Sequence, residues 1–538
     1  MNKRIISREE IRKELIEGMK EIAGVVKRTL GPGGNIILME RIGQSLDGSP
    51  LSPRITKDGV SVAQECASPD PVKDLVIQTV KAICKKTNSV AGDGTTTAIV
   101  LGEAILLETL KELEKDTDLN PQLVKESIEK ASKEVIEELH KLATPIKNNT
   151  MIKQVATISA NGDSEIGEVI GNAFNHVGAE GVVTVDEGHT SHITLDIVDG
   201  YQFNRGAEAQ DSFFNNKDLT QFEAENVRLI IYDGKLLNYT DLITALTSLI
   251  EQSKNNGSKS IPPVVVIANE FSREVINWML IQKTDAGMVI CPVRGPHQTN
   301  VRTGYYQDIA VMSGGTRMGG GSRSLNNFDR EDAGVVSKVV ITKYSTTLYD
   351  GQGHEDDILS RVDQLKSMKE KAESPYDAQI LGDRLAALTN GIAKIGVGGV
   401  TDLEIKEKYD RIEDALNASR AAISEGIVPG GGTTLLRIAE SLKNKKDIGS
   451  KILKRALKYP FLQILENIGK EKLTKEILKD IINDESLVYD ARNSCIVDSL
   501  SVGIIDPVKV TRTALENAVS IASLLSTTGG GIIFVNNK

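Results

Sequence analysis

The chain has 538 residues and a formal net charge of −10, and at roughly 150 residues per domain this length predicts three to four domains. Hydrophobic residues make up 40 % and charged residues 26 %, which is ordinary for a folded globular protein and argues against disorder as the main state. The acidic balance and the low aromatic content of 4 % argue against a nucleic-acid-binding surface, and no apolar run approaches the ~20 residues that cross a bilayer.

The predicted elements change in character twice along the chain. Apolar residues recur at helical spacing in the first third, so we expect helices over residues 8–30, 72–90, 97–115 and 121–142. From about residue 181 the pattern becomes strand-like, at 182–185 and 193–197. Between 227 and 343 short β-rich runs alternate with helical ones, as in a compact α/β domain; strands are expected at 227–232, 264–268, 288–293, 309–312 and 335–341, and helices at 239–254 and 272–284. After residue 391 helices return, at 402–424, 433–443, 450–468, 472–482 and 507–526.

The strongest local signal for chemistry is the run Ala91-Gly92-Asp93-Gly94-Thr95-Thr96-Thr97, a glycine turn that leads directly into a helix. Free N–H groups and the dipole at a helix N-terminus attract anions, and glycines let a phosphate approach the backbone closely. Asp93 could also hold Mg²⁺ or orient a water molecule. Because Asp, Gly and Thr are also good N-cap residues, phosphate binding and simple capping both stay open from the residues alone.

Four weaker motifs place glycines or charges at element boundaries. They are Gly31-Pro32-Gly33-Gly34 after the first helix, Thr56-Lys57-Asp58-Gly59, the pair Glu413-Asp414 on the helix at 402–424, and Gly430-Gly431-Gly432 before two threonines that open a helix. For most of these a plain turn or a solvated helix face is the simpler interpretation, although the triple glycine is a second possible anion cradle.

Several known site motifs are absent from the sequence. It contains no P-loop pattern G-x-x-x-x-G-K-[ST], no G-x-G-x-x-G, no G-x-S-x-G and no C-x-x-C pair among its four cysteines. A nucleotide site would therefore have to be built from separated loops.

The α/β centre has two features of its own. Gly200 and Gly391 stand at its entry and its exit, as loop glycines or as hinges that absorb a large change of backbone angle. The helix at 272–284 is apolar nearly all round, which favours either full burial or an apolar surface kept for a partner.

Together these residues resemble the group I chaperonins, the GroEL type. The motifs follow the family's order and lie near its spacing, from about residue 10 to about residue 528: Thr29-Leu30-Gly31-Pro32, 56–63, 91–97, 154–161, Glu413-Asp414-Ala415-Leu416, 430–432 and 503–512. Together with these other motifs, the Gly-Asp-Gly-Thr-Thr-Thr block is highly specific for the family. The departures described below predict a divergent paralogue.

The resemblance implies a multidomain chaperonin fold. It has a mostly helical equatorial domain (1–143 and 426–538), a small intermediate domain (144–199 and 392–425) and an α/β apical domain (200–391). It also implies a bacterial, cytoplasmic ATPase of the protein-folding class grouped with the isomerases, which uses ATP, Mg²⁺ and K⁺. The implied partners are non-native polypeptides, a small co-chaperonin lid, and further copies of the chain or of a paralogue in two stacked seven-membered rings, with no nucleic acid and no membrane.

The resemblance further implies roles for individual residues. The phosphate and metal contacts are Thr29, Leu30, Gly31, Pro32, Lys57, Asp93, Gly94, Thr95, Thr96 and Thr97, with Asp93 on Mg²⁺, and the base and ribose side is Gly431, Asp490, Ala491 and Asp506. Asp58 and Asp414 are the catalytic acids, and Asp414 orients the attacking water. Clients and the lid bind to Phe213, Phe214, Ile243, Leu246, Ile276, Leu280 and Ile281, and the hinges are Pro145, Gly200, Gly391 and Gly426.

The sequence departs from the family pattern where assembly and recognition are concerned. Gly33 stands where the family usually has Lys, and Asp490 and Arg492 change the run near the adenine, where a carboxylate could weaken contacts to the base. Residues 41–54 form a longer loop than the hairpin that pairs with a neighbouring subunit, and segments 206–211 and 295–302 differ from the apical pattern. These departures leave an alternative open, in which the chain binds clients or acts as a scaffold without using ATP.

Overall fold

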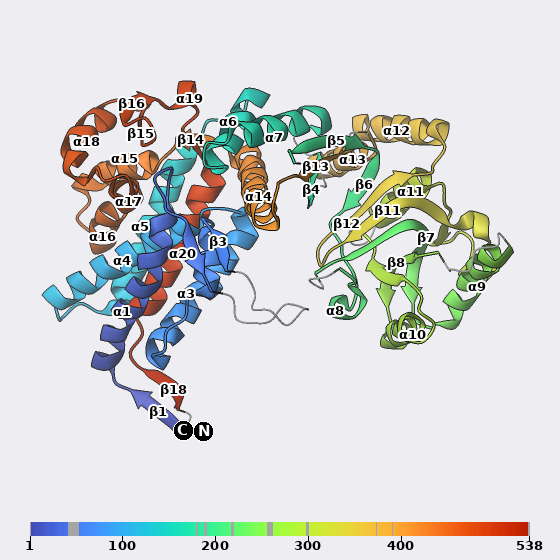
Figure 1. Ribbon diagram of the computed structural model, residues 1–538, viewed down its shortest axis with the longest axis horizontal. Helices are drawn as coiled ribbons and strands as arrows, with labels where there is room; N and C mark the ends of the chain where they lie inside the picture. Colours follow the sequence, from blue (N-terminus) through green and yellow to red (C-terminus); the bar gives the residue numbers. More distant parts are fainter. Residues whose placement is uncertain are drawn as a thin grey trace. The chain divides into compact units, whose positions relative to one another are not determined.

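The computed structural model describes residues 2–40, 53–178, 181–187, 191–216, 220–255, 262–296, 301–372, 374–389 and 391–535. Internal contacts divide the chain into two compact units (Figure 1). Unit 1 comprises Met1–Asn172, Val185–Thr194 and Gly396–Lys538, and unit 2 comprises Ala173–Thr184 and Leu195–Ile395. Unit 1 is mainly helical and unit 2 is α/β, which confirms the predicted fold class, while the finer division into three domains stays a prediction.

Unit 1 is mainly helical, with one large apolar core and smaller apolar clusters beside it. Its helices are α1 (Arg8–Val26), α2 (Gly59–Glu65), α3 (Pro71–Ala91), α4 (Thr95–Lys115), α5 (Pro121–Lys141), α6 (Asn149–Ser159), α14 (Asp402–Glu425), α15 (Thr433–Ser441), α16 (Ile448–Ala456), α17 (Tyr459–Asn467), α18 (Thr474–Asn483), α19 (Ser499–Val502) and α20 (Val508–Ser526), and α7 (Ser164–Val177) follows α6. Helices α4 and α20 pack side by side although they are far apart in the sequence, and Leu101 and Ile521 on them are fully buried. No helix in the described ranges combines the length and the hydropathy needed to cross a membrane.

Short antiparallel strand pairs complete unit 1. Strand β1 (Asn2–Ile6) pairs with β18 (Gly531–Val535), β2 (Ile37–Met39) with β3 (Arg54–Thr56), β14 (Ile427–Pro429) with β17 (Ile505–Pro507), and β15 (Leu487–Asp490) with β16 (Cys495–Asp498). The first pair joins the two ends of the chain, which Figure 1 shows next to each other. The third pair sets Val428 opposite Asp506, so it brings the triple glycine close to that carboxylate.

Unit 2 contains a seven-stranded sheet of order β6-β12-β11-β7-β8-β9, with β10 paired to β7. Its strands are β6 (Gly200–Phe203), β7 (Phe222–Leu236), β8 (Val264–Phe271), β9 (Ile290–Arg294), β10 (Arg317–Gly319), β11 (Gly334–Ile341) and β12 (Thr346–Gly351). Strands β7, β8 and β9 are parallel, and β8 is a continuous run of buried apolar residues, as expected for a strand covered on both faces. The helices are α8 (Gln210–Phe213), α9 (Thr240–Asn255), α10 (Arg273–Thr284), α11 (Arg302–Ser313), α12 (Glu355–Glu370) and α13 (Pro375–Thr389), and a further sheet has the order β4 (Val182–Glu187), β13 (Ile392–Val397), β5 (Thr194–Val198).

Most of the predicted elements are confirmed, but the strand predicted at 309–312 is wrong. These residues belong to helix α11, with Ile309, Ala310 and Met312 buried, because a four-residue apolar run does not by itself distinguish a strand from a buried helix. The single helix expected at 450–468 is two helices, α16 and α17, and Pro460 lies in the first turn of the second, where its missing N–H is not needed. The sequence did not predict α6, α7, α12 or α13.

Candidate functional site

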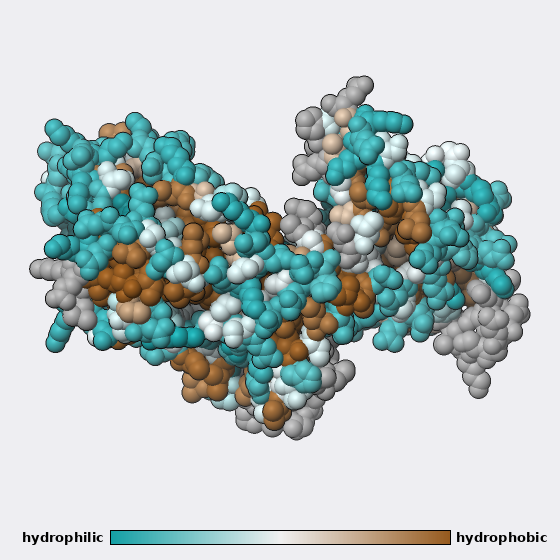
Figure 2. Space-filling view, turned by 90° about the horizontal axis from the view of Figure 1, so that it is seen from above, coloured by the Kyte–Doolittle hydropathy of each residue, from teal (hydrophilic) through white to brown (hydrophobic). Residues whose placement is uncertain are grey.

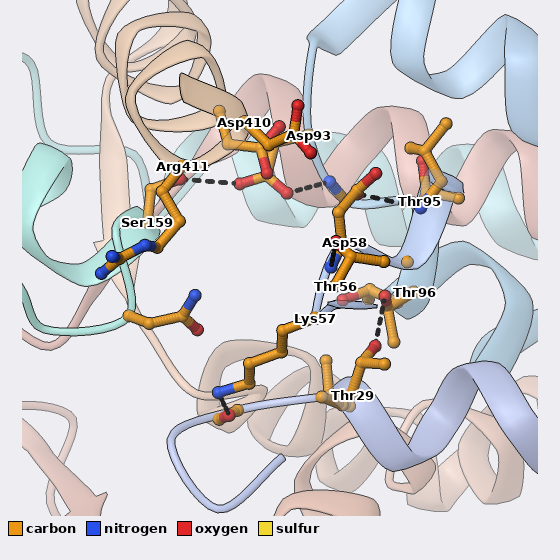
Figure 3. Close-up of a pocket in the computed structure, with 18 of the residues that line it drawn as sticks. Thr29, Thr56, Lys57, Asp58, Asp93, Thr95, Thr96, Ser159, Asp410 and Arg411 are labelled. Carbon is orange, nitrogen blue, oxygen red and sulfur yellow. Dashed lines mark hydrogen bonds between the residues drawn. The ribbon is translucent and has the colours of Figure 1, made fainter. Parts of the chain in front are cut away.

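A polar cavity of about 140 Å³ lies at the N-terminus of helix α4 in unit 1. Five parts of the sequence line it: residues 29–31, residues 56–60, residues 93–97, Ser159 with Asn161, and Glu407, Asp410, Arg411 and Asp414 of α14. Figure 3 shows Lys57, Asp58, Asp93 and Arg411 around one open space. The structure therefore brings together almost all the residues predicted to contact phosphate and metal, with both predicted catalytic acids beside them.

Two glycines shape the turn before α4. Gly92 and Gly94 have φ values of 70° and 86°, in the left-handed region that glycine adopts without strain. Gly94 is the N-cap residue of α4 and has no side chain to accept from the first-turn N–H groups. A Cβ at Gly94 would lie 2.7 Å from Val510 Cγ1, so any side chain there would also crowd α20. The backbone thus presents a helix N-terminus whose donors are open to an anion.

Thr95 and Thr433 carry buried hydroxyls that have no hydrogen-bond partner among the described residues. Each opens a helix directly after a left-handed glycine, Thr95 on α4 and Thr433 on α15. Leaving a buried hydroxyl unpaired costs about 1–3 kcal/mol. Because Thr95 lines the polar cavity, a bound ligand rich in oxygen atoms would relieve this cost.

The carboxylates of Asp93 and Asp414 face the same cavity. Asp93 accepts from the Gly94 N–H at 2.5 Å and from the Ser159 hydroxyl at 3.1 Å, and burial raises its pKa despite these donors. Burial, followed by the negative charges of Asp93 and Asp58, raises the pKa of Asp414 well above its usual value. The described residues contain no group of three or more side chains placed to hold a metal ion. Mg²⁺ is usually bound by one or two carboxylates together with substrate phosphates, so the carboxylates of Asp93 and Asp414 fit the predicted metal only alongside a phosphate ligand.

Lys57 and Arg411 bring positive charge to the cavity. Lys57 Nζ donates to the Gly31 carbonyl at 2.9 Å, and its pKa is lowered by burial and then by the charges of Arg492 and Arg411. Arg411 pairs with Glu407 at 2.8 Å and with Asp163 at 3.1 Å, which fixes its position on α14.

Asp58 has a defined structural task as well as its place in the cavity. It is the N-cap residue of α2, and its two carboxylate oxygens accept from the N–H groups of Val60 at 3.0 Å and Ser61 at 2.7 Å. A Cβ at Gly59 would lie 2.0 Å from Thr96 Oγ1, so glycine is what allows α2 to begin this close to α4.

Sequence reasoning gave no site role to eight residues that line the polar cavity: Thr56, Gly59, Val60, Ser159, Asn161, Glu407, Asp410 and Arg411. The Asp410 carboxylate pairs with Arg54 at 3.1 Å. A usable signal was present, because Asp410 and Asp414 are four residues apart on one helix and so share a face.

A larger cavity of about 430 Å³ continues from the polar one, since both are lined by Leu30, Gly31, Asp93, Gly94, Thr97, Ser159 and Asn161. It adds Pro32 and all the residues predicted for the base and ribose, Gly431, Asp490, Ala491 and Asp506, together with apolar walls from Val428, Ile464 and Ile504. An apolar slot beside a polar cradle has the form expected for a ligand with a flat ring at one end and charged oxygens at the other.

Asp490 does not present a free carboxylate to this cavity. Its Oδ1 accepts from the N–H groups of Arg492 at 2.9 Å and Asn493 at 3.0 Å, and its Oδ2 accepts from Asn493 Nδ2 at 2.7 Å. The Asp490 carboxylate therefore stabilises the turn at residues 490–493. The expectation that it would oppose a base by its charge is corrected to a structural role for that carboxylate.

On the predicted base and ribose side of the site, burial destabilises the ionised form of Asp506. Its carboxylate accepts from the N–H groups of Gly432 and Gly431, yet burial raises its pKa from 3.8 to about 6. It thereby takes the place of a side-chain cap at the start of α15, which Gly432 lacks.

Replacing Asp506 by asparagine is expected to stabilise the ligand-free protein at pH 7 by about 1–2 kcal/mol. A carboxyl whose folded-state pKa is raised binds its proton more tightly when folded, so the wild-type loses stability as pH rises from about 4 through about 6. The variant lacks this loss, so its advantage in thermal midpoint should be present at pH 7 and largely gone at pH 4.5. An equal difference at both pH values would contradict the assignment.

The predicted client-binding residues of unit 2 divide into exposed and buried side chains. Phe213, Phe214 and Leu246 lie in the core with exposed fractions of 0 %, 5 % and 3 %, so they stabilise unit 2 and offer no surface in this conformation. Leu246 lies on the face of α9 that also carries the buried Leu242 and Leu249. This corrects the expectation for those three residues.

The other four side chains reach the surface to different degrees. Ile243 on α9 and Ile281 on α10 are exposed by 42 % and 52 %, and Ile276 and Leu280 are partly buried. On α10 only Val275 and Met279 are buried, and Trp278 stacks on Tyr239 with ring centroids 5.6 Å apart. Of the two interpretations left open for this helix, full burial is therefore wrong.

The predicted hinge residues lie where separate backbone segments approach closely. Thr144 and Ile427 form an antiparallel bridge that brings Pro145 and Gly426 together, and a Cβ at Gly426 would lie 2.7 Å from the Thr144 carbonyl. Gly391 has a φ of 64°, and a Cβ at Gly200 would lie 2.3 Å from Ile392 Cδ1. These contacts explain the glycines, and a hinge role stays a prediction.

Comparison with known proteins was made by sequence family and by structure. The family model described as the TCP-1/cpn60 chaperonin family matches residues 22–254 and 299–528. The fold is similar to that of the chaperonin gp146 from the bacteriophage EL 2 (Pseudomonas aeruginosa), crystallised in the presence of ATP-BeFx, at 21 % identity over 99 % of both chains. The TM-scores are 0.71 for its crystal form II and 0.66 for form I.

Proposed function

The chain belongs to the TCP-1/cpn60 chaperonin family, and from this premise we propose that it is an ATP-hydrolysing chaperonin that binds non-native polypeptides. The observation that carries the proposal is the polar cavity, where an open helix N-terminus, the unpaired Thr95 hydroxyl and the carboxylates of Asp93 and Asp414 converge. A helix start with only a structural role would not need these groups to meet in one cavity. The adjoining 430 Å³ cavity gives room for a base and ribose.

In this proposal the nucleotide lies across both cavities. Its phosphates meet the N-terminus of α4 and Lys57, and its ribose meets Asp506 at the start of α15. Asp93 would hold Mg²⁺, and a K⁺ requirement belongs to the same proposal. When bound, Mg²⁺ would neutralise charge on the phosphoryl group that is transferred.

The chain's own residues then do the work of positioning. Lys57 and Arg411 stabilise negative charge on the phosphate oxygens, and Arg411 is already fixed by its two acidic partners. Asp414 lines the polar cavity, burial and then the charges of Asp93 and Asp58 raise its pKa, and its carboxylate orients the attacking water. Because both oxygens of Asp58 accept hydrogen bonds at the start of α2, this carboxylate is held in place at the wall of the cavity.

We place client and lid binding on helices α9 and α10 of unit 2. Ile243 and Ile281 are apolar side chains exposed on these helices, and Leu237 just before α9 is exposed by 56 %. Apolar side chains held at the surface are what a non-native chain would bind through its own exposed apolar groups. Phe213, Phe214 and Leu246 support this surface from below.

We further propose that copies of the chain assemble into rings through two strand pairs of unit 1. Leu38 and Ile55 face each other across β2 and β3, and Ile5 and Ile532 face each other across β1 and β18, all with side chains exposed by 44–80 %. Two-stranded sheets are marginal alone and leave unpaired edges, which a neighbouring copy would complete. Figure 2 shows hydrophobic side chains at the surface in patches between hydrophilic ones.

Replacing Leu38 by aspartate is expected to prevent ring formation, because a buried interface charge without a partner costs several kcal/mol. Native mass spectrometry should show the wild-type as multiples of 58.3 kDa, with seven copies per ring, and the variant as the single chain. Leu123→Asp, at an exposed position on α5, is the control for loss of an exposed leucine. A variant that still forms rings would contradict this use of β2 and β3.

The function itself is tested by two assays on the full chain. We expect Mg²⁺-dependent ATP hydrolysis, and ATP-dependent recovery of a chemically unfolded client enzyme that aggregates when diluted alone. Suppression of client aggregation without any hydrolysis would overturn the ATPase and favour the scaffold alternative. Absence of both activities would overturn the proposed function.

A further inference from the structure

Arg492 joins two turns that lie on opposite parts of the larger cavity. It follows strand β15, and its Nη2 donates to the Asn161 carbonyl at 2.7 Å while its Nη1 donates to the Gly162 carbonyl at 3.4 Å. Asn161 and Gly162 form the turn between α6 and α7, which is 330 residues away in the sequence. All three residues line the cavity, so the contact is part of its wall.

The backbone of the turn at residues 161–162 leaves room for the Arg492 guanidinium. Asn161 and Gly162 both have left-handed φ values, 58° and 81°, and the Gly162 N–H is tied to the Thr157 carbonyl at 2.7 Å. A Cβ at Gly162 would lie 2.5 Å from Arg492 Nη2 and 2.7 Å from its Cζ. Any side chain at position 162 would therefore push the guanidinium away, so glycine here and arginine at 492 fit each other.

The turn that carries Arg492 is equally well fixed. Asp490 holds it through three hydrogen bonds to Arg492 and Asn493, so the arginine leaves the strand in a defined direction. The two unusual residues of this segment, Asp490 and Arg492, thus act together. The Asp490 carboxylate stabilises the turn, and the Arg492 side chain reaches from this turn to residues 161 and 162.

The positive charge of Arg492 acts on both cavities. In the described part of the chain its guanidinium hydrogen-bonds two carbonyls and no carboxylate. Its charge contributes to lowering the pKa of the neighbouring Asp490, against the effect of burial, and that of Lys57 in the polar cavity. A guanidinium that retains its charge beside an anion-binding cavity adds attraction for a bound nucleotide.

We propose that Arg492 is a clasp on the nucleotide cavity, which links the turn at residues 490–493 to the turn at residues 161–162 and slows the release of bound nucleotide. This rests on the proposed function, because the bound nucleotide is the ligand that the clasp retains. Nucleotide can leave when the two turns separate, so the strength of the Arg492 contact sets the release rate. Arg492 is a positioning residue and takes no part in bond breaking.

The clasp is tested by the rate at which a fluorescent ADP analogue is displaced from the full chain by excess ADP. Arg492→Ala and Gly162→Ala should each speed release about tenfold, which is equivalent to about 1.4 kcal/mol, while binding rates change little. Arg492→Lys should be intermediate, because an ammonium group has no paired donors to match two carbonyls. The double variant should release no faster than Arg492→Ala, since one contact is lost in both. Arg455→Ala, which removes an exposed arginine paired with Glu108 and Glu112 far from the cavities, is the control for loss of an arginine.

A second readout needs no nucleotide. Hydrogen exchange of the amides at residues 162–167 should be faster in ligand-free Arg492→Ala than in wild-type or Arg455→Ala. If the wild-type binds nucleotide and Arg492→Ala releases it at the same rate, the clasp is overturned and the proposed function stands. If the wild-type binds no nucleotide, the proposed function and the clasp's role in release both fall, and unchanged exchange at 162–167 overturns the contact itself.

Discussion

Asp414→Ala is expected to lower the rate of ATP hydrolysis by about 10²–10⁴-fold while the affinity for ATP stays close to that of the wild-type. Asp414 lines the polar cavity from helix α14, and burial, followed by the charges of Asp93 and Asp58, raises its pKa. Removing it takes away the group that orients water and leaves the phosphate cradle at α4 intact. Single-turnover hydrolysis and equilibrium ATP binding separate the two effects.

Ser424→Ala provides the control for Asp414. Ser424 lies on the same helix, it is exposed, and it does not line the cavity. Its loss should leave hydrolysis within about twofold of the wild-type, since surface substitutions rarely change more than ±0.5 kcal/mol. Equal losses of rate in both variants would show that α14 as a whole is disturbed, and an Asp414→Ala variant with the wild-type rate would remove Asp414 from the mechanism.

Asp93→Asn is expected to abolish the Mg²⁺ dependence of nucleotide binding and to weaken binding in Mg²⁺ by 10- to 100-fold or more. Asparagine can keep the acceptor for the Gly94 N–H at 2.5 Å, so the turn before α4 is retained while the metal ligand's charge is lost. Titration calorimetry with ATP, with and without Mg²⁺, measures both quantities. The wild-type should bind more tightly with Mg²⁺, and the variant should bind equally in both conditions.

Stability distinguishes this effect from misfolding. Burial raises the pKa of Asp93, which means that its charge destabilises the ligand-free fold at neutral pH. Asp93→Asn should therefore unfold at the same temperature as the wild-type or higher, although it binds poorly. A variant with a lowered melting temperature would place Asp93 among structural residues, and a variant that keeps full Mg²⁺ dependence would rule out Asp93 as the metal ligand.

Most residues that line the two cavities were singled out in the sequence, because the turn and the helix start that carry them are local features. The run from Gly92 to Thr97 specifies a left-handed turn and a helix start, and these two features already define an anion cradle. What the sequence left open was whether Asp93 only caps the helix. The structure places it beside Asp414 and the unpaired Thr95, which no periodicity or spacing could bring together.

Burial was the property that the sequence predicted least well. Phe213, Phe214 and Leu246 match an apolar client-binding surface in type, but unit 2 uses them as core. An apolar side chain gains free energy equally well from a partner or from its own fold, and residue type does not distinguish the two. The strand wrongly predicted at 309–312 has the same origin, since its apolar residues are buried on a helix.

Length and composition indicated a large acidic multidomain protein, and the motifs indicated a chaperonin-like one. The family, the helix starts at the cavities and most helices and strands could be predicted, because these features depend on neighbours along the chain. The fold was needed to show that Arg492 contacts Gly162, that the Asp490 carboxylate stabilises a turn, and which apolar side chains of unit 2 reach the surface. The Arg492 contact joins residues about 330 positions apart, and burial in unit 2 follows from packing of its core. The Asp490 turn is local, but residue type alone does not predict which hydrogen bonds its carboxylate makes.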